Sequence, residues 1–301
     1  MAKKLVQFDW AIKKLLRHKT NFSILEGFLS ELLGFDLTID SILESEGNQS
    51  DADDKHNRVD ILVRSTEDEL MLVEIQNDPQ IDYFHRMIYG ASKLITEYIQ
   101  RGDPYGTVKK VFSVNIVYFD LGQGSDYIYE YRGHFEGRHQ KDVLQPSQRQ
   151  QHDYHITEVA DIFPKYYLLK VNNFDDVARS SLDEWIYFLK NSEVKEEFGA
   201  RGLNEAREKL REESLTTEER KAYERYQESR RVERSVLDTA MKEGMEEGLE
   251  KGMEKGRKEG SAKREKEIIR SMHGNGLAAE QIAEFTKIPL ETVRRILQDF
   301  T

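Results

Sequence analysis

The chain has 301 residues, 38% of them hydrophobic and 34% charged, a length that suits one large domain with an appendage or two domains. Cysteine is absent, which excludes disulfides and thiolate metal sites, and the formal net charge of −11 excludes a general positive field for DNA. The sequence shows no apolar run that could span a bilayer and no signal peptide, so we expect a cytoplasmic protein without a membrane partner.

The beginning of the chain predicts two helices followed by a strand. Apolar residues at helical spacing indicate helices over residues 8–18 and 21–34, and the second ends at Gly34. Residues 36–45 alternate as in a strand, and residues 46–56 form a polar loop. This order is typical of an α/β domain.

A strand pair and a long helix come next. Residues 58–64 and 69–76 are predicted to form two strands around the turn at residues 65–68. A helix over residues 80–102 follows them. The apolar, β-branched segment 109–121 predicts a strand, which we place at the centre of the sheet.

The remainder of the first domain predicts two strands and a closing helix. Residues 126–137 and 152–162 alternate well enough to be strands. Residues 181–192 have helical spacing, with Ser181 as the expected N-cap. The domain would end with this helix.

The composition changes near residue 195. Beyond it the chain consists almost entirely of Glu, Lys, Arg, Gly and Met. We therefore expect three parts: an α/β domain over residues 1–194, a charged helical extension over 195–270 and a small helix-turn-helix-like module over 271–301.

The predicted strand pair carries two carboxylates. In a symmetric hairpin centred on Glu67, Asp60 lies opposite Glu74, and Gln76 shares their face. Neighbouring carboxylates repel, and the pKa of one rises unless a cation separates them. Mg²⁺ suits such a site, with Mn²⁺ or Ca²⁺ as alternatives, and would activate water and offset charge on a phosphate. The alternative is a polar sheet face that carries acids without function.

An ordered set of these segments resembles a known family. Residues 58–76 are similar to the PD-(D/E)XK nuclease core, in the variant that ends in Gln. With residues 8–16, 83–105 and 111–119, the chain resembles the Rpn family of recombination-promoting nucleases and putative transposases over about residues 5–190. The resemblance implies a restriction-endonuclease-like mixed sheet flanked by helices, and Mg²⁺-dependent endonuclease activity on DNA.

The resemblance also assigns roles to residues. Asp60 and Glu74 would be metal ligands, and Gln76 would stand where the family usually has lysine. A glutamine there orients groups by hydrogen bonds but carries no charge, so activity would be slower or would need a second ion. Asp9 matches the family's first-helix acid and could complete the metal shell; the alternative is an aspartate favoured by the helix dipole.

Arg86 lies on the helix that follows the acids. If that helix packs beside them, Arg86 could contact a substrate phosphate. The alternative is a surface ion pair with Asp82, four residues earlier. The sequence leaves both open.

The extension carries a glycine every four residues. Each glycine costs a helix about 1 kcal/mol relative to alanine, but a glycine stripe allows two backbones to approach closely. We expect this helix to pair with its own copy, with an unpartnered charged helix or a separate small protein inhibitor as alternatives. The glycines are Gly244, Gly248, Gly252, Gly256 and Gly260.

Residues 277–300 predict a helix, a short turn and a second helix that begins near Pro289. Arg294 and Arg295 are the basic groups that the second helix offers, so a protein contact is as plausible as DNA recognition. The expected core is Leu277, Ile282, Phe285, Ile288, Val293, Ile296 and Leu297.

Two classes of function follow. The first is a metal-dependent DNA endonuclease of the transposase-related type, dimeric through its tail. The second is a catalytically weakened nuclease-like scaffold that acts as an oligomeric DNA- or protein-binding regulator.

Overall fold

The computed structural model describes residues 5–14, 16, 18–43, 60–99 and 101–298, so the predicted polar loop at residues 46–56 lies outside the described residues. The chain forms two compact units, Met1–Glu224 and Arg225–Thr301. No helix in these described ranges is long and apolar enough to cross a membrane.

A six-stranded mixed sheet lies at the centre of the first unit, in the order β1-β2-β3-β4-β6-β5. β1, β2 and β3 are antiparallel neighbours, β3, β4 and β6 are parallel, and β5 is antiparallel to β6. The expected mixed α/β sheet is confirmed, with the strand predicted at 109–121 in its interior. The strands are β1 (Ile39–Leu43), β2 (Ile61–Ser65), β3 (Leu70–Gln76), β4 (Val111–Val117), β5 (Ile128–Glu130) and β6 (Lys165–Lys170).

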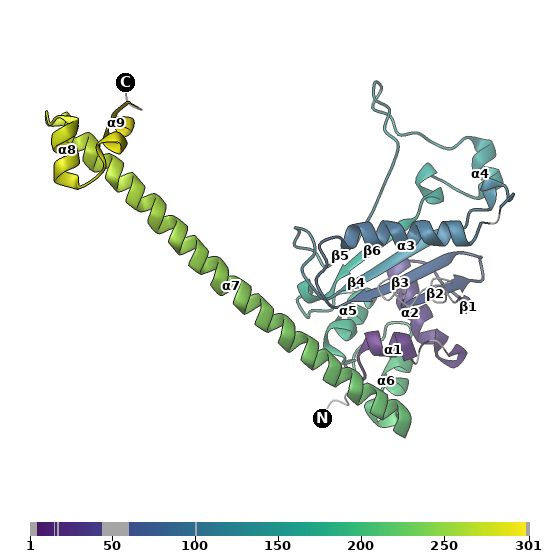
Figure 1. Cartoon of the computed structure of the whole chain (residues 1–301). Helices are drawn as coiled ribbons and strands as arrows, with labels where there is room; N and C mark the ends of the chain where they lie inside the picture. Colours follow the sequence, from purple (N-terminus) through teal and green to yellow (C-terminus); the bar gives the residue numbers. More distant parts are fainter. Residues whose placement is uncertain (1–4, 15, 17, 44–59, 100, 299–301) are drawn as a thin grey trace. The chain divides into compact units, whose positions relative to one another are not determined.

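Helices cover both faces of the sheet. Figure 1 shows α3 along one face, with α1, α2, α5 and α6 on the opposite side. Apolar side chains of β2, β3 and β4 pack with Ala91 and Leu94 of α3 on the first face. The helices are α1 (Phe8–Lys14), α2 (Phe22–Leu33), α3 (Tyr83–Glu97), α5 (Ser181–Asn191) and α6 (Leu203–Lys209).

An aromatic cluster joins the helices on the second face. Phe8 of α1 and Phe28 of α2 have ring centroids 5.8 Å apart in an edge-to-face arrangement. The rings of Trp185 and Phe188 of α5 lie 6.4 and 5.8 Å from the ring of Phe8 between centroids and complete the cluster. Buried aromatic contacts of this kind hold α1 and α5, far apart in the sequence, together.

Two strand predictions were wrong in part or entirely. The segment 126–137 forms only the three residues of β5, and residues 152–162 form no strand. Helix α4 (Gln148–Tyr154) covers the start of the latter, because Ser147 and Gln150 make a capping box. The sheet instead uses β6, a strand that alternation did not reveal because its last four residues are all buried.

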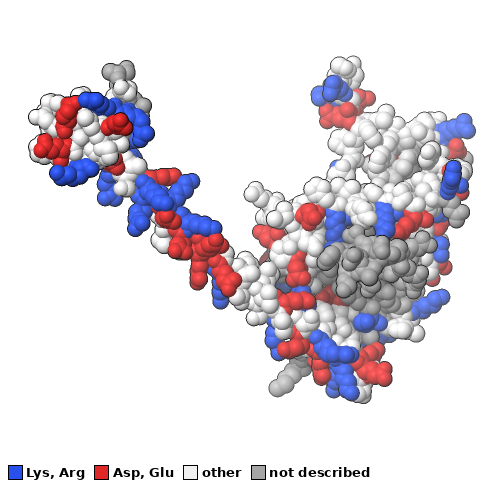
Figure 2. Space-filling model, viewed as in Figure 1, with Lys and Arg blue, Asp and Glu red and all other residues white. Residues whose placement is uncertain are grey.

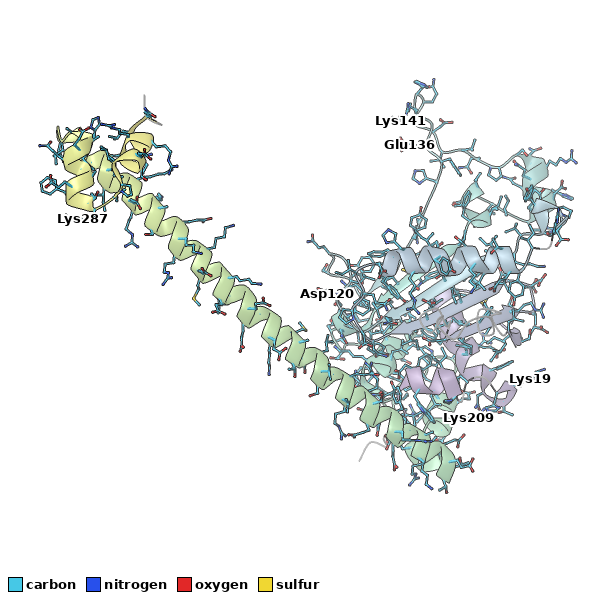
Figure 3. The ribbon with its side chains drawn as sticks, in the orientation of Figure 1. Lys19, Asp120, Glu136, Lys141, Lys209 and Lys287 are labelled. Carbon is cyan, nitrogen blue, oxygen red and sulfur yellow. The ribbon has the colours of Figure 1, made fainter. Side chains whose placement is uncertain are left out.

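The chain between β5 and α4 extends away from the sheet. Glu136 and Val143 form an isolated bridge in it. Glu136 also pairs with Lys141 at 3.2 Å, and Figure 3 labels both residues near the end of this segment.

The N-cap of helix α5 lies one residue earlier than expected. The Oγ of Ser180 accepts a hydrogen bond from Asp183 N at 3.2 Å, so Ser180 is the N-cap and the assignment to Ser181 was wrong. Ser180 has extended backbone angles, which an N-cap requires.

The first unit continues past residue 194, where the sequence suggested its end. Leu203 and Ala206 of α6 are buried. Gly27 of α2 packs directly on the backbone of Arg201 and Gly202. The Nζ of Lys209 donates to the carbonyl of Thr20; Figure 3 labels Lys209 and Lys19 on this side of the unit.

Helix α7 (Thr217–Gly274) is a single helix of 58 residues that contains the whole glycine ladder. Its first turns belong to the first unit, where Tyr223 lies 5.0 Å from Trp10 between ring centroids. Figure 2 shows acidic and basic side chains interspersed along the rest of the helix. Ion pairs four residues apart, such as Lys251 with Glu247, stabilise it modestly.

The second unit ends in two short helices, α8 (Ala279–Thr286) and α9 (Leu290–Gln298), which pack on the end of α7. The predicted hairpin and most of its core are present. Phe285 is an exception, because 69% of it is exposed; Ile269 of α7 is buried in the cluster instead. The core is Ile269, Ile282, Val293 and Ile296, with Leu277, Ile288 and Leu297 partly buried against it.

Candidate active site

The hairpin of β2 and β3 brings the two acids together. Its pairing joins Ile61 to Val73 and Leu62 to Leu72, which confirms the symmetric register predicted from the sequence. Asp60 directly precedes β2 and falls opposite Glu74 in this register. Both acids therefore lie near the carboxyl end of β3.

Asp60 is held against the backbone of the neighbouring strand. Its Oδ2 accepts a hydrogen bond from Ile75 N at 2.6 Å. Because Ile75 follows Glu74 in β3, this bond fixes the Asp60 carboxylate next to that of Glu74.

Glu74 is a buried carboxylate, with 6% of the residue exposed. Burial raises its pKa from 4.5 to about 7; Arg86 opposes the rise and the negative charge of Asp60 adds to it. An acid that titrates near neutrality beside a second carboxylate is typical of a functional site. The pair repels unless a cation is present.

Arg86 supplies a positive charge at this position. Its Nε lies 3.4 Å from Glu74 Oε2, yet the two atoms are not aligned as a hydrogen bond. Among the described residues, neither buried atom has any hydrogen-bond partner. The alternative ion pair with Asp82 is not found in the described part of the chain; the contact there is between Arg86 N and the Asp82 carbonyl.

Two polar residues that the sequence analysis did not single out lie beside Glu74. Asn115 is its register partner on β4, and the Tyr83 hydroxyl donates to Asn115 Oδ1 at 3.3 Å. Asn115 in turn donates to the Oγ of Ser113 at 2.9 Å. A lone Asn in the apolar segment 109–121 was the available signal, since buried amides need specific partners.

Tyr83 stays protonated at this site. Burial raises its pKa well above the ordinary value of 10, and the negative charge of Glu74 raises it further. Its hydroxyl therefore acts as a hydrogen-bond donor to Asn115 and not as a base.

Gln76 lies at the end of β3 and is partly exposed. Its Nε2 donates to the carbonyl of Asp78 at 3.3 Å. The amide thus takes part in the turn that ends the strand. The bond is long, so a modest rotation would free the amide for another partner.

Asp9 is buried at the same end of β3, with 5% of the residue exposed. Its Oδ2 accepts from Asn77 Nδ2 at 3.0 Å, and its Oδ1 accepts from Trp10 N at 2.8 Å. Asn77 directly follows Gln76, so Asp9 is joined to the strand end.

The structure does not bring Asp9 into one cluster with the acid pair. Within the described ranges, no group of three or more His, Asp or Glu residues is placed so that it could hold a metal ion. Asp60 and Glu74 interact electrostatically, whereas Asp9 acts on Tyr118, whose pKa rises through burial and then this charge.

The acid pair nevertheless fits a hard divalent cation. Glu74 Oε2 is buried and has no hydrogen-bond partner among the described residues, and burial raises the pKa of this carboxyl although Arg86 opposes the rise. Asp60 places a second carboxylate beside it. Oxygen ligands of this charge are those that Mg²⁺ and Mn²⁺ prefer.

A buried lysine lies at the same end of the sheet. Lys170 ends β6, is 2% exposed and pairs with Asp120 Oδ1 at 2.9 Å. It is the register partner of Val117, which pairs with Gln76 across β3 and β4. The sequence analysis missed Lys170 because it missed β6.

An apolar groove of about 550 Å³ is lined by residues of α3, β5 and β6 and of the segment before β6, and neither Asp60 nor Glu74 lines it. Exposed aromatic side chains, including Phe84 and Tyr131, form its walls. The chemistry of the acid pair therefore lies outside this groove.

The six-stranded mixed sheet with helices on both faces fits the fold of the PD-(D/E)XK nuclease class. Residues 6–240 match the family described as PD-(D/E)XK nuclease family transposase, and the chain belongs to this family. The resemblance recognised in the sequence is thus confirmed. Comparisons with curated proteins and with solved structures gave no match.

Proposed function

We propose that the protein is a metal-dependent DNA endonuclease of the recombination-promoting, transposase-related type. The observation that carries the proposal is the Asp60–Glu74 pair, held by the hairpin register and by the bond from Ile75 N, in a chain of this nuclease family. The reaction is hydrolysis: a bond forms between a water oxygen and phosphorus, and a P–O ester bond of the DNA strand breaks.

Asp60 and Glu74 would hold the cation, with Mg²⁺ as first choice and Mn²⁺ or Ca²⁺ as alternatives. A divalent ion at such a site supplies a bound water of lowered pKa and offsets negative charge on the phosphate. Gln76 would orient the attacking water by hydrogen bonding once its amide leaves the Asp78 carbonyl. Asp9 would fix the strand end through Asn77.

A local positive charge is needed at the site because the whole chain carries −11. Arg86 is within reach of the acid pair and would contact the scissile phosphate. Such a contact positions DNA without reading its sequence.

The tail would make the enzyme dimeric. In the described structure, a Cβ added at Gly244, Gly248 or Gly252 meets no atom within 4 Å. Met245 and Leu249 next to the stripe are exposed. A second copy of this helix could therefore approach closely. A separate inhibitor that binds the same stripe is the competing partner.

The terminal hairpin favours a protein contact over DNA recognition. Arg294 of α9 pairs with Glu280 of α8 at 2.6 Å, so one of its two arginines is already engaged. We assign catalysis to the first unit, Met1–Glu224, and oligomerisation and protein contact to the rest of α7 and to the terminal hairpin, and we expect the protein to act in the cytoplasm.

A cleavage assay tests the proposal. Wild type and Asp60→Asn are incubated with single- and double-stranded DNA and with RNA, in Mg²⁺, Mn²⁺, Ca²⁺ or chelator. Asparagine keeps an oxygen for Ile75 N but loses the charge, so cleavage should fall at least about 100-fold. Asp238→Asn, on the exposed face of α7, is the matched control. Intact substrates with wild type under every condition would refute the endonuclease.

The second candidate is a catalytically weakened scaffold that acts as a regulator. Gln76 in place of lysine, engaged with the Asp78 carbonyl, favours it. Calorimetric titration of Mn²⁺ separates the two candidates, because a degenerate site shows no binding heat that depends on Asp60. Mn²⁺ binding that Asp60→Asn abolishes supports the enzyme.

A further inference from the structure

Arg86 and Glu74 form an unusually incomplete ion pair. The Nε–Oε2 distance is 3.4 Å, and both atoms are buried without a hydrogen-bond partner in the described part of the chain. The other contact of the guanidinium, from Nη1 to Gln80 Oε1, is also 3.4 Å long. Arg86 is therefore held by two contacts at the long end of the range.

Other arginines of this protein show what a completed pair looks like. Arg179 lies 2.6 Å from Asp175, and Arg201 lies 2.7 Å from Asp36, each in hydrogen-bonding geometry. Those pairs are on the surface, where alignment brings little energy. In the buried pair of Arg86 and Glu74, hydrogen-bonding geometry would contribute more stabilisation, yet Nε and Oε2 do not have that geometry. The Glu74 carboxylate thus has charge compensation but retains an unbonded oxygen.

An uncompensated carboxylate next to Asp60 would be costly in a buried site. A guanidinium that supplies charge without closing hydrogen bonds lowers this cost and leaves an oxygen for another cation. A divalent ion at Glu74 would then repel Arg86, because two positive charges would share one carboxylate. Gln80, which precedes α3, gives the guanidinium a contact away from Glu74.

We infer that Arg86 is the resident counter-ion of Glu74: it compensates the carboxylate in the metal-free protein, is displaced when a divalent ion binds, and is then presented to the DNA phosphate. This inference rests on the proposed metal site at Asp60 and Glu74. It makes Arg86 a positioning residue whose ion pair opposes metal binding.

Removing the positive charge of Arg86 should raise the affinity for Mn²⁺ and lower the stability of the metal-free protein. Arg86→Gln should bind Mn²⁺ more tightly than wild type, by about tenfold, since the competing cation is gone. The same variant should unfold at lower urea concentration in chelator, because Glu74 loses its compensation. A merely structural arginine would lower both metal affinity and stability.

The experiment is a calorimetric Mn²⁺ titration of the full chain, paired with urea unfolding in chelator. Arg86→Lys keeps the charge and should keep an affinity close to that of wild type. Arg64→Gln is the matched control, because Arg64 pairs with Asp40 at 3.6 Å elsewhere on the same sheet. In the Glu74→Gln background, Arg86→Gln should no longer raise Mn²⁺ affinity.

A measurement on wild type covers the case in which Arg86→Gln does not fold. Addition of Mg²⁺ should move the NMR resonance of the Arg86 Nε–H group and leave that of Arg64 unchanged. An unmoved Arg86 signal at saturating Mg²⁺ overturns the inference.

The counter-ion role of Arg86 and the proposed metal site at Asp60 and Glu74 can fail separately. Asp60-dependent Mn²⁺ binding in wild type, with equal or weaker binding in folded Arg86→Gln, overturns the counter-ion role and leaves the metal site intact. Absence of Asp60-dependent binding in wild type and in Arg86→Gln overturns both.

Discussion

At the scale of single residues, the candidate site contains a buried carboxylate, Glu74, whose negative charge is compensated only in part. Glu74 interacts with Asp60 and Arg86 and is the register partner of Asn115, yet its Oε2 has no hydrogen-bond partner among the described residues. Its pKa rises to about 7 because burial outweighs the arginine. A cation at this position would offset the remaining negative charge.

The raised pKa predicts how stability changes with pH. Between pH 4.5 and about 7, folded Glu74 keeps a proton that the unfolded chain releases, so the free energy of unfolding falls as pH rises. The decrease from this group is up to about 3 kcal/mol and is complete above the folded pKa. Urea unfolding in chelator at pH 5, 6, 7 and 8 measures it.

Glu74→Gln should remove this part of the pH dependence, because glutamine does not titrate. The exposed Glu67→Gln variant controls for the loss of one negative charge. An unchanged pH slope in Glu74→Gln would show that another group is responsible.

At the scale of elements, local signals found most helices and the antiparallel hairpin. Gly34, with φ of 75°, ends α2 as predicted, because glycine tolerates the left-handed conformation. Residues 152–162 mimicked a strand by alternation, whereas β6 is buried along most of its length and has no alternation to detect. The neighbours of a strand decide which of these patterns belongs to the sheet.

The N-cap of α5 is a local feature whose assignment to Ser180 can be tested directly. Ser180→Ala should lower the free energy of unfolding by about 1 kcal/mol, because the Asp183 amide loses its acceptor. Ser181→Ala removes the exposed neighbouring hydroxyl and should change stability far less. Thermal unfolding followed by circular dichroism compares them; equal losses would place the cap elsewhere.

The contact between α2 and the segment before α6 predicts a steric effect. A Cβ at Gly27 would lie 2.8 Å from the Gly202 Cα, which is backbone and cannot rotate away. Gly27→Ala should therefore destabilise the first unit by about 2 kcal/mol, although alanine favours helices. Urea unfolding measures this loss.

Gly199→Ala is the control for Gly27→Ala, because an added Cβ there meets no atom within 4 Å. A stable Gly27→Ala variant would mean that the two backbones are farther apart than the structure places them.

At the scale of the whole molecule, a nuclease-class unit is continuous with a long charged helix. The family match extends over residues 6–240 and so includes the first turns of α7. The whole glycine ladder, from Gly244 to Gly260, lies beyond it. We therefore expect the ladder to act in assembly and not in the folding of the first unit.

Alanine substitutions in the ladder test this expectation. Gly248→Ala with Gly252→Ala should stabilise an isolated helix by about 1 kcal/mol each, but should separate a dimer whose backbones approach along the stripe. Sedimentation equilibrium of the full chain reports the mass. Glu246→Ala with Glu250→Ala changes the opposite face of the helix and should leave the mass unchanged.

The sequence alone determined the fold class, the family and the position of Asp60 opposite Glu74, because hairpin register follows from strand periodicity over a few residues. Only the tertiary structure decided what surrounds Glu74: Asn115 comes from β4 and Arg86 from α3. It also decided that residues up to Glu224 belong to the first unit. Burial and charge pairing depend on neighbours distant in the chain, and local patterns do not encode them.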